Sequence, residues 1–176
     1  MERTAIGPTE YFDAVMAVMR SRGLLLAATD PRGRANAMTI GWGAMGGVWS
    51  MPVWIVLVRP SRYTYACIEH GGAFTVNVPA ADMAGACEVC GTRSGRDGDK
   101  LAEAHLTPAP AGNVAAPVLD ECPIVYECEV VHRNDVRPEM LVKELAEGPY
   151  AGGDYHRVYF GRIVAASAAG DAASRL

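Results

Sequence analysis

Hydroxyl and basic side chains alternate over residues 59–64, and together they have the chemistry of an anion site. The chemically active members are Arg59, Ser61, Arg62 and Thr64. A β-branched apolar run before this stretch predicts a buried strand, and the spacing after it predicts a helix of about two to three turns from Arg62, with Ser61 as N-cap. Helix starts have unpaired N–H groups and a positive dipole end, so these side chains would suit a phosphate. The alternative is a well-capped helix with solvated arginines.

A second candidate lies in a predicted strand over residues 35–45, where glycines and small residues replace larger side chains. Glycine weakens a strand and often marks the close approach of a ligand or another backbone. Asn36, Met38 and Trp42 would share one face, with Thr39 on the other. An amide and an indole on one face suit a flat aromatic ligand. A barrel strand whose asparagine binds a turn is an equal alternative.

Residues 90–100 form a polar stretch broken by glycines, with three basic side chains, Arg93, Arg96 and Lys100, and two hydroxyls. A plain solvated connection between elements is the first interpretation. Flexible N–H donors beside these cations could instead clamp an anionic ligand.

The five cysteines predict buried, reduced thiols rather than a metal or redox centre. Their number is odd and no leader pattern precedes them. Cys87 and Cys90 form a C-x-x-C, but no second Cys or His pair completes a zinc site. Cys122 and Cys128 lie six apart in a strand-like run and would share a face. Glu88, beside the first pair, would raise the pKa of a neighbouring thiol.

Length and charge narrow the class of protein. At 176 residues, half apolar and a fifth charged, the chain fits one domain over residues 1–176, with its core at about 20–165. A net charge of −4 gives no electrostatic footprint for nucleic acid. Without an apolar membrane span or a leader pattern, we expect a cytoplasmic protein with neither a nucleic-acid nor a membrane partner.

The order of the elements predicts a mainly β fold. Helices are expected after a Thr9 cap, where Phe12, Val15, Met16 and Met19 form an apolar stripe, from Arg62, and over 82–89. Residues 46–52 and 107–118 are expected to be loops, and the tail beyond 166 to fray. Strands are expected over residues 24–29, 35–45, 53–58, 74–79, 124–131 and 155–165, with 140–143 extending the sheet. Because no strand–helix repeats occur, an antiparallel barrel with short helices fits best.

Four motifs occur in one order along most of the chain: residues 36–39 with Trp42, residues 59–64, residues 74–79 and residues 90–101. In composition and spacing they resemble the flavin reductase-like FMN-binding split-barrel family, which includes flavoredoxin. The resemblance implies an antiparallel split β-barrel of Greek-key type and a homodimer that binds FMN near the subunit interface.

The resemblance also implies a set of cofactor-binding residues, with no catalytic side chain and no metal. In chain order these are Asn36, Met38, Thr39, Trp42, Arg59, Ser61, Arg62, Thr64, Asn77, Ser94, Gly95, Arg96, Lys100, His132 and Phe160. The first four would contact the ring and ribityl chain, and Ser61, Arg62 and Thr64 would bind the phosphate. Asn77 with residues 94–100 would close over the cofactor, and His132 and Phe160 resemble positions near the flavin. Leu101 stands where relatives often have an aromatic residue.

The implied function is an FMN-dependent oxidoreductase, in the simplest case an NAD(P)H:flavin reductase. A bound flavin carries the redox chemistry, so the protein need only bind it and set the electrostatics. Lys100 or Arg96 near the ring would stabilise reduced flavin, and Trp42 would shield one face. No G-x-G-x-x-G fingerprint occurs, so NAD(P)H would bind transiently. The alternatives are a flavoredoxin-like electron carrier reduced by a partner protein, and a split barrel without flavin.

Overall fold

The computed structural model describes all 176 residues, and most of its strands form one antiparallel sheet. The strand order is β3-β2-β6-β9-β10-β5-β4, and β1 pairs with β10. These strands are β1 (Thr4–Ala5), β2 (Leu24–Thr29), β3 (Ala35–Ile40), β4 (Gly43–Val48), β5 (Met51–Val58), β6 (Ala73–Val78), β9 (Ile124–Asp135) and β10 (Arg157–Ala168). A mainly β, antiparallel fold is therefore confirmed.

The sheet is open between β3 and β4. These strands lie at opposite ends of the strand order, yet Gly41 and Trp42 alone join them in the chain. The single strand expected over 35–45 was therefore wrong, because the backbone leaves one end of the sheet there and enters the other. At Gly43 a Cβ would lie 2.8 Å from the carbonyl oxygen of Ile55, so the paired backbone leaves no room for a side chain.

Residues expected to form a loop over 46–52 instead form a tight hairpin between β4 and β5. Only Trp49 and Ser50 lie outside the strands, and their φ angles are 51° and 59°. Two successive left-handed residues are typical of the two-residue hairpin turn that matches strand twist. Residues 107–118 likewise contain a small two-stranded sheet, β7 (Pro108–Pro110) with β8 (Pro117–Leu119).

The helices are α1 (Phe12–Ser21), α2 (Tyr63–Gly71), α3 (Ala84–Thr92), α4 (Lys100–Glu103), α5 (Lys143–Glu147) and α6 (Ala172–Arg175), with a 3₁₀ turn η1 (Pro138–Met140). The expected N-cap residues, Thr9 and Ser61, were both wrong. Tyr11 and Arg62 hold the N-cap positions of α1 and α2, and neither makes a side-chain cap bond. None of these helices has the length and apolar content needed to cross a membrane.

Two apolar clusters hold the sheet, and β2 contributes to both. Leu24, Leu26 and Ala28 enter the larger cluster, which also contains the buried stripe of α1, while Leu25 and Ala27 enter the smaller one. This follows from the alternation of side chains along a strand. In α1, Phe12 is 38% exposed and Val18 is buried in the stripe instead. The smaller cluster packs α3 and α4 against β2 and β3, which places residues 93–99 beside the start of α2.

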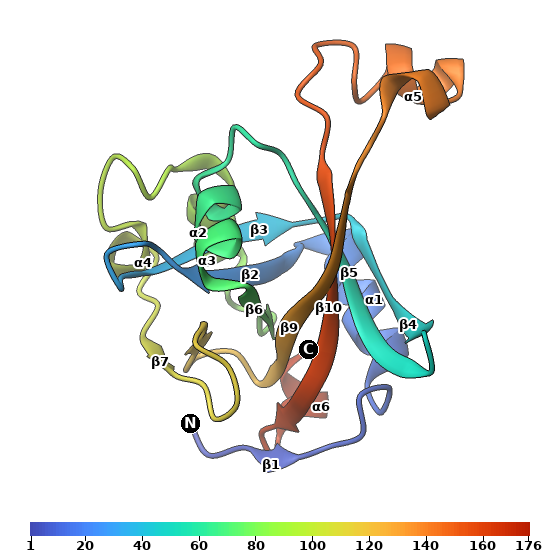
Figure 1. Cartoon of the computed structure of the whole chain (residues 1–176). Helices are drawn as coiled ribbons and strands as arrows, with labels where there is room; N and C mark the ends of the chain where they lie inside the picture. Colours follow the sequence, from blue (N-terminus) through green and yellow to red (C-terminus); the bar gives the residue numbers. More distant parts are fainter.

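The chain between β9 and β10, residues 136–156, projects from the sheet as an arm that carries η1 and α5 (Figure 1). Residues 140–143 therefore do not extend the sheet, contrary to expectation. The arm exposes Met140, Val142 and Leu145. At its base, the guanidinium of Arg59 donates to the carbonyl oxygens of Pro149, Gly153 and Asp154.

The C-terminal residues are ordered by packing, so the expected fraying was wrong. Ala172 in α6 is fully buried. The backbone N–H of Ala81 donates to the carbonyl oxygen of Arg175, and the Arg22 guanidinium donates to that of Leu176. Small residues allow this close packing against the barrel.

Candidate ligand-binding site

A cleft of about 160 Å³ lies between the start of α2, strand β3 and the loop after α3, and we call it the cationic cleft. Its polar and charged side chains come from Thr39, Ser61, Arg62, Tyr63, Thr64, Cys90, Thr92, Arg93, Ser94, Arg96 and Lys100. Four of these are cations and none is a carboxylate. The cleft therefore has a strong positive potential and many hydroxyl and N–H donors, which is the composition of a phosphate or other anion site.

Lys100 is the most unusual cation of this cleft because it is only 6% exposed and has no carboxylate partner. Its Nζ donates to the carbonyl oxygens of Cys90 and Arg93, at 3.2 Å each. Burial lowers the pKa of Lys100. A buried ammonium that has only neutral acceptors is costly, so an anion in the cleft would balance its charge.

The start of α2 already accepts a carboxylate from the chain itself. The Ser61 hydroxyl donates to Asp154 Oδ2 at 2.6 Å, and the Ser61 N–H donates to Oδ1 at 3.4 Å. The Arg96 guanidinium donates to the Ser61 carbonyl oxygen at 2.9 Å and lies over the Tyr63 ring. The first N–H groups of a helix have no intrahelical partner. This end of α2 is therefore an anion-attracting position, although Ser61 is not its N-cap.

Asn36 sits behind the cleft as a support rather than beside an open surface. Its Nδ2 donates to Thr64 Oγ1 at 2.7 Å, and its Oδ1 is buried without a partner. Gly95 packs directly on this oxygen and on the Tyr63 ring, and a Cβ at position 95 would collide with both. Asn36 and Gly95 together fix the Thr64 hydroxyl and the position of the loop.

A second cleft of about 180 Å³ adjoins the first, and we call it the aromatic cleft. It is lined by Met38, Thr39, Ile40, Gly41, Trp42, Leu57, Arg59, Arg62 and His156. The two clefts share Met38, Thr39 and Arg62. The Trp42 ring is 48% exposed and lies 5.3 Å from the His156 ring. A cationic cleft joined to a partly apolar, aromatic one suits a flat ring system that carries an anionic group.

His156 is a residue of this site that the sequence did not indicate. It is 8% exposed, and its Nδ1 lies 2.8 Å from the Tyr150 hydroxyl. Burial, together with the positive charges of Arg59 and Arg62, lowers the pKa of His156 to about 4. The imidazole is therefore neutral at pH 7. No spacing in the sequence ties it to Trp42, because the arm brings the two together.

Five of the predicted cofactor-binding residues do not line either cleft: Asn36 and Gly95, which lie behind the cationic cleft, and Asn77, His132 and Phe160. Asn77 is fully buried; its Nδ2 donates to Leu25 O and Thr75 Oγ1, and its Oδ1 accepts from the Leu119 N–H, so it holds β6 to its neighbours. His132 and Phe160 lie 5.2 Å apart, ring to ring. Both contact the exposed Trp49 at the β4–β5 turn, at 5.7 and 5.6 Å. Within this chain they form a separate surface cluster.

The other predicted residues do gather here. Met38, Thr39, Ser61, Arg62, Thr64, Ser94, Arg96 and Lys100 line the cationic cleft, and Trp42 and Arg59 line the aromatic one. Arg96 and Lys100 lie beside the start of α2 and not beside Trp42, so they suit the anionic end of a ligand rather than its ring. Arg59 lines the aromatic cleft, but its guanidinium donates its hydrogen bonds to carbonyl oxygens of the arm.

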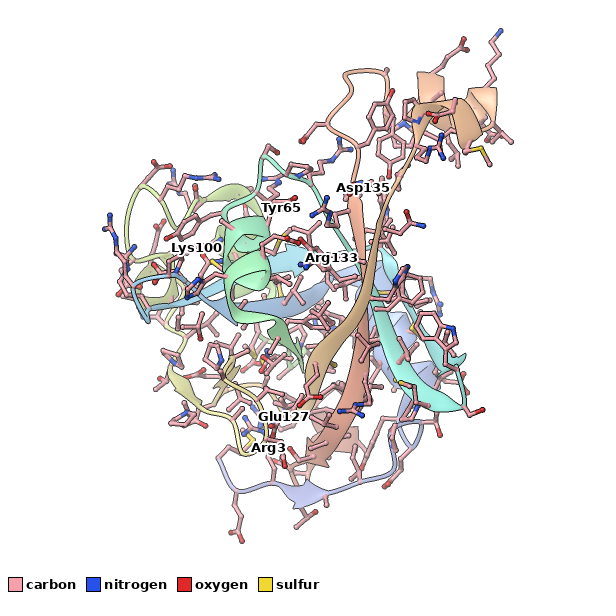
Figure 2. All side chains as sticks on the ribbon, viewed as in Figure 1. Arg3, Tyr65, Lys100, Glu127, Arg133 and Asp135 are labelled. Carbon is pink, nitrogen blue, oxygen red and sulfur yellow. The ribbon has the colours of Figure 1, made fainter.

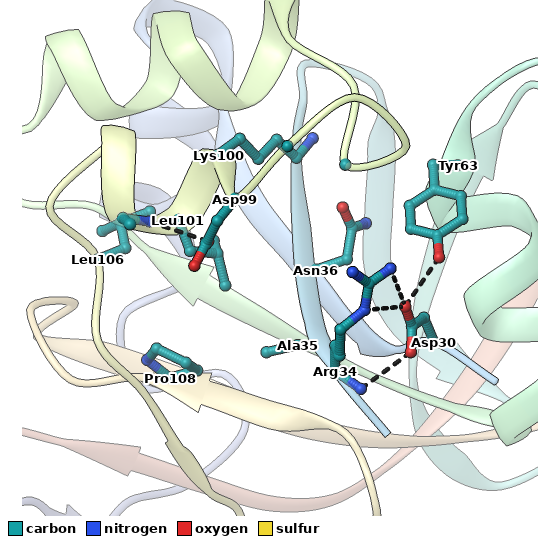
Figure 3. Close-up of a pocket in the computed structure, with 13 residues that line it drawn as sticks. Asp30, Arg34, Ala35, Asn36, Tyr63, Asp99, Lys100, Leu101, Leu106 and Pro108 are labelled. Carbon is teal, nitrogen blue, oxygen red and sulfur yellow. Dashed lines mark hydrogen bonds and ion pairs between the residues drawn. The ribbon is translucent and has the colours of Figure 1, made fainter. Parts of the chain in front are cut away.

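A further cavity of about 300 Å³ lies on the far side of Asn36, Tyr63 and Lys100 (Figure 3). At one side of it lies Asp30, which accepts bonds from Arg34 and from the Tyr63 hydroxyl. The Arg34 backbone N–H, aided by these contacts, holds the pKa of Asp30 well below its usual value. Because this carboxylate is fully paired within the chain, the cluster braces the β2–β3 turn against α2.

The five cysteines are free and buried, and Cys90 alone among them lines one of the two clefts. Cys87 and Cys90 pack in the smaller apolar cluster, where burial raises both pKa values, that of Cys90 to about 11. Burial, not Glu88, is the main cause. Cys122 joins this cluster and Cys128 the larger one, so the expected shared face was wrong.

Comparison with known proteins gives the class that this fold and site define. The family model described as flavin reductase like domain matches residues 19–176, and the chain belongs to this family. This confirms the resemblance seen in the four motifs.

Two flavoredoxins of known structure agree with this assignment. Flavoredoxins of Desulfovibrio vulgaris (Miyazaki F) and Methanosarcina acetivorans are 26% and 27% identical, with TM-scores of 0.69 and 0.68. Each alignment covers 84% of this chain and 69% or 68% of that chain. An FMN-binding domain of a flavin reductases-like enzyme from Shewanella baltica, 15% identical at a TM-score of 0.67, shares the fold over 95% of this chain and 77% of its own. An uncharacterised protein of Archaeoglobus fulgidus is 32% identical over 98 residues. The matched part is 56% of this chain and 55% of the length of that relative.

Proposed function

We propose that this protein binds FMN across the two joined clefts and acts as a flavin-dependent oxidoreductase. The observation that carries the proposal is a cleft with four cations and no carboxylate, joined through Arg62 to a cleft bordered by Trp42. The first suits the phosphate group and the second the flavin ring. Membership of the flavin reductase-like family supports a flavin-related oxidoreductase or electron-transfer role.

The residues present fit such a cofactor. Arg62 and Lys100, with the Ser61 and Thr64 hydroxyls, would hold the phosphate by charge-assisted bonds. The buried Lys100 ammonium would gain the counter-charge that the chain does not provide. When bound, the flavin supplies hydride and single-electron transfer.

The aromatic cleft would bind the ring through apolar contact rather than charge. Trp42 borders it, and the neutral His156 imidazole is fixed by the Tyr150 hydroxyl. A neutral imidazole there adds no positive charge beside the ring at pH 7. The protein's part in the chemistry is to bind, orient and shield, so no acid–base pair is needed.

The electron donor that we propose first is NAD(P)H, which would bind transiently because no dinucleotide fingerprint is present in the sequence. A flavoredoxin-like carrier reduced by a partner protein is the second candidate. Identities of 26% and 27% with two flavoredoxins favour it.

One anaerobic titration tests both candidates. FMN is first added to the purified protein, and quenching of flavin fluorescence reports binding. Bleaching of bound FMN by NADH or NADPH supports the reductase; bleaching only by dithionite or a reduced partner protein supports the carrier. Absence of FMN binding would contradict the proposal in both forms.

We also propose a homodimer in which both subunits border the flavin. The support is the apolar surface left exposed on one chain: Trp49 is 57% exposed beside His132 and Phe160, and Met140 on the arm is 75% exposed. Such surface is usually covered by a partner. In a dimer, His132 and Phe160 could still approach a flavin held by the other subunit. Light scattering that finds a monomer with FMN fully bound would contradict this.

A further inference from the structure

The carboxylate of Asp154 stands where the proposed function puts a phosphate oxygen. It accepts from both the hydroxyl and the N–H of Ser61, at 2.6 and 3.4 Å. Ser61 is one of the hydroxyl residues of the cationic cleft. Whatever anion enters the cleft at Ser61 must therefore share these donors with Asp154 or displace it.

The position of Asp154 is set by the backbone around it. Asp154 and Gly153 are both left-handed, with φ angles of 54° and 74°. The Arg59 guanidinium donates to the carbonyl oxygens of these two residues, at 2.8 and 3.2 Å, and lies 5.3 Å from the centre of the Tyr150 ring. Arg59 is two positions before Ser61, so one short stretch anchors the loop and accepts its carboxylate.

The charge of Asp154 opposes that of an incoming phosphate. A phosphate ester and a carboxylate that compete for one hydroxyl repel each other, and neither is deeply buried, since Ser61 and Asp154 are both exposed. Solvent screening makes this repulsion modest but not zero. The neutral ring of a flavin would not be repelled by the Asp154 carboxylate in this way.

We propose that Asp154 determines how tightly phosphorylated flavin is held, by competing with the phosphate group for Ser61. This rests on the proposed function. Asp154 lowers the preference of the site for FMN over riboflavin, and it speeds release of FMN.

The test compares two ligands and three variants. Dissociation constants for FMN and riboflavin are measured by fluorescence quenching for the wild type, Asp154→Ala and Asp154→Asn, and FMN release is followed by stopped flow. The expected result for Asp154→Ala is FMN binding about two- to fivefold tighter, with slower release and unchanged riboflavin affinity. Asp154→Asn should show a smaller gain, because the amide can still accept from Ser61. Asp171→Ala, another exposed aspartate that makes no side-chain bond, is the matched control and should change neither ligand.

Different outcomes separate this inference from the proposed function. If Arg62→Ala weakens FMN binding but Asp154→Ala leaves it unchanged or weakens it, the role of Asp154 is overturned and the flavin site stands. Equal gains for FMN and riboflavin also overturn it, because they exclude competition with the phosphate. Failure of wild-type protein to bind either flavin overturns the proposed function, and the inference with it.

Discussion

Charged side chains lie near both ends of helix α2. Those near its C-terminal end are paired with opposite charges of the chain, whereas Lys100, near its start, has no carboxylate partner. Near its C-terminal end, Glu69 accepts from the Tyr159 hydroxyl at 2.8 Å and from Arg133 at 3.0 Å, and pairs with Arg157 at 3.3 Å. Arg157 also makes a two-pronged contact with Asp135. Figure 2 shows Arg133 and Asp135 on one side of this helix.

Lys100 lies on the other side of α2, in the cationic cleft (Figure 2). The charges around Glu69 compensate one another within the chain, and they tie α2 to the base of the arm. In the cationic cleft, Arg93 pairs with the exposed Glu103, but Lys100 and Arg96 donate only to carbonyl oxygens. A buried cation without a counter-charge costs stability, so the positive charge kept in the cleft favours the binding of an anionic ligand there. The Glu69 network needs no such ligand and is structural.

The largest effect that would separate the two ends is on ligand binding. Arg62→Ala combined with Thr64→Val should weaken FMN binding by about 1.5–3 kcal/mol for the charged contact alone, while the fold persists. Fluorescence quenching gives the dissociation constant. Arg162→Ala, which removes an exposed arginine paired with Glu129, is the control and should bind FMN normally. An unchanged constant in the double variant would remove these residues from phosphate binding.

Removing a charge near the C-terminal end of α2, where Glu69 is paired, should lower stability rather than ligand binding. Glu69→Gln leaves Arg157 and Arg133 without their shared carboxylate, so the free energy of unfolding at pH 7 should fall by about 1–3 kcal/mol. Urea denaturation measures it. FMN affinity of the folded protein should change little, and a selective loss of FMN binding at full stability would break the comparison.

Lys100→Met should have the opposite effects to Glu69→Gln: it should weaken FMN binding without lowering stability. Replacing a buried cation that lacks a carboxylate with an apolar side chain of similar length should leave the ligand-free protein as stable or more stable, and should weaken FMN binding. Thermal melts with and without FMN report both quantities on one sample. A variant that loses stability but keeps FMN affinity would mean that Lys100 is structural.

The effect of pH on stability should come partly from His156. Its pKa is about 4 in the folded protein against an ordinary 6.5, so the unfolded chain takes up a proton first. Stability should therefore fall as pH decreases from about 6.5 to about 4. His156→Gln should flatten urea-derived stability over that window, and His70→Gln, at an exposed position, should not.

From the acid end of that window downward, the Glu69 network should begin to fail. Burial alone would raise the pKa of Glu69, but bonds from Tyr159 and Arg157 outweigh it and lower the pKa. The bond from Arg157 also lowers the pKa of Asp135. A lowered carboxyl pKa contributes stability above its ordinary value, which is lost as pH falls through the folded one.

The smallest effect is expected from the thiols. Burial keeps Cys87 and Cys90 protonated, so neither is a ready nucleophile or electron relay. Cys87→Ser with Cys90→Ser should keep NAD(P)H-driven flavin reduction within about a few-fold of wild type, with any loss arising from packing. A collapse of turnover while FMN stays bound would show that the thiols carry electrons.

The parts of the site that sequence could predict are those built from one short stretch. Residues 59–64 predicted an anion site because a helix start and its hydroxyls are local features, and the loop cations followed from composition. Asn77 was assigned to the cofactor by resemblance. A buried asparagine on a strand has the same sequence signature whether it binds a ligand or, as here, neighbouring backbone.

His156 and Asp154 could not be predicted because the arm returns them to the site after a long excursion. Their neighbours in space, Trp42 and Ser61, are far away in sequence, and no periodicity links them. The break at Gly41 was missed for a related reason. A glycine inside a strand pattern has one signature whether it receives a ligand or lets the chain leave the sheet.

The central place of β10 in the sheet has a consequence for how the protein is made. The β4–β5 hairpin joins the other strands only through β10, which pairs with β5 on one side and β9 on the other. Strand β1, at the opposite end of the chain, also pairs only with β10. During synthesis, residues up to about position 156 can therefore form two partial sheets but cannot unite them. These contacts are distant in sequence, so the barrel closes slowly and late, and the apolar faces of both halves stay open to chaperones until the last strand leaves the ribosome.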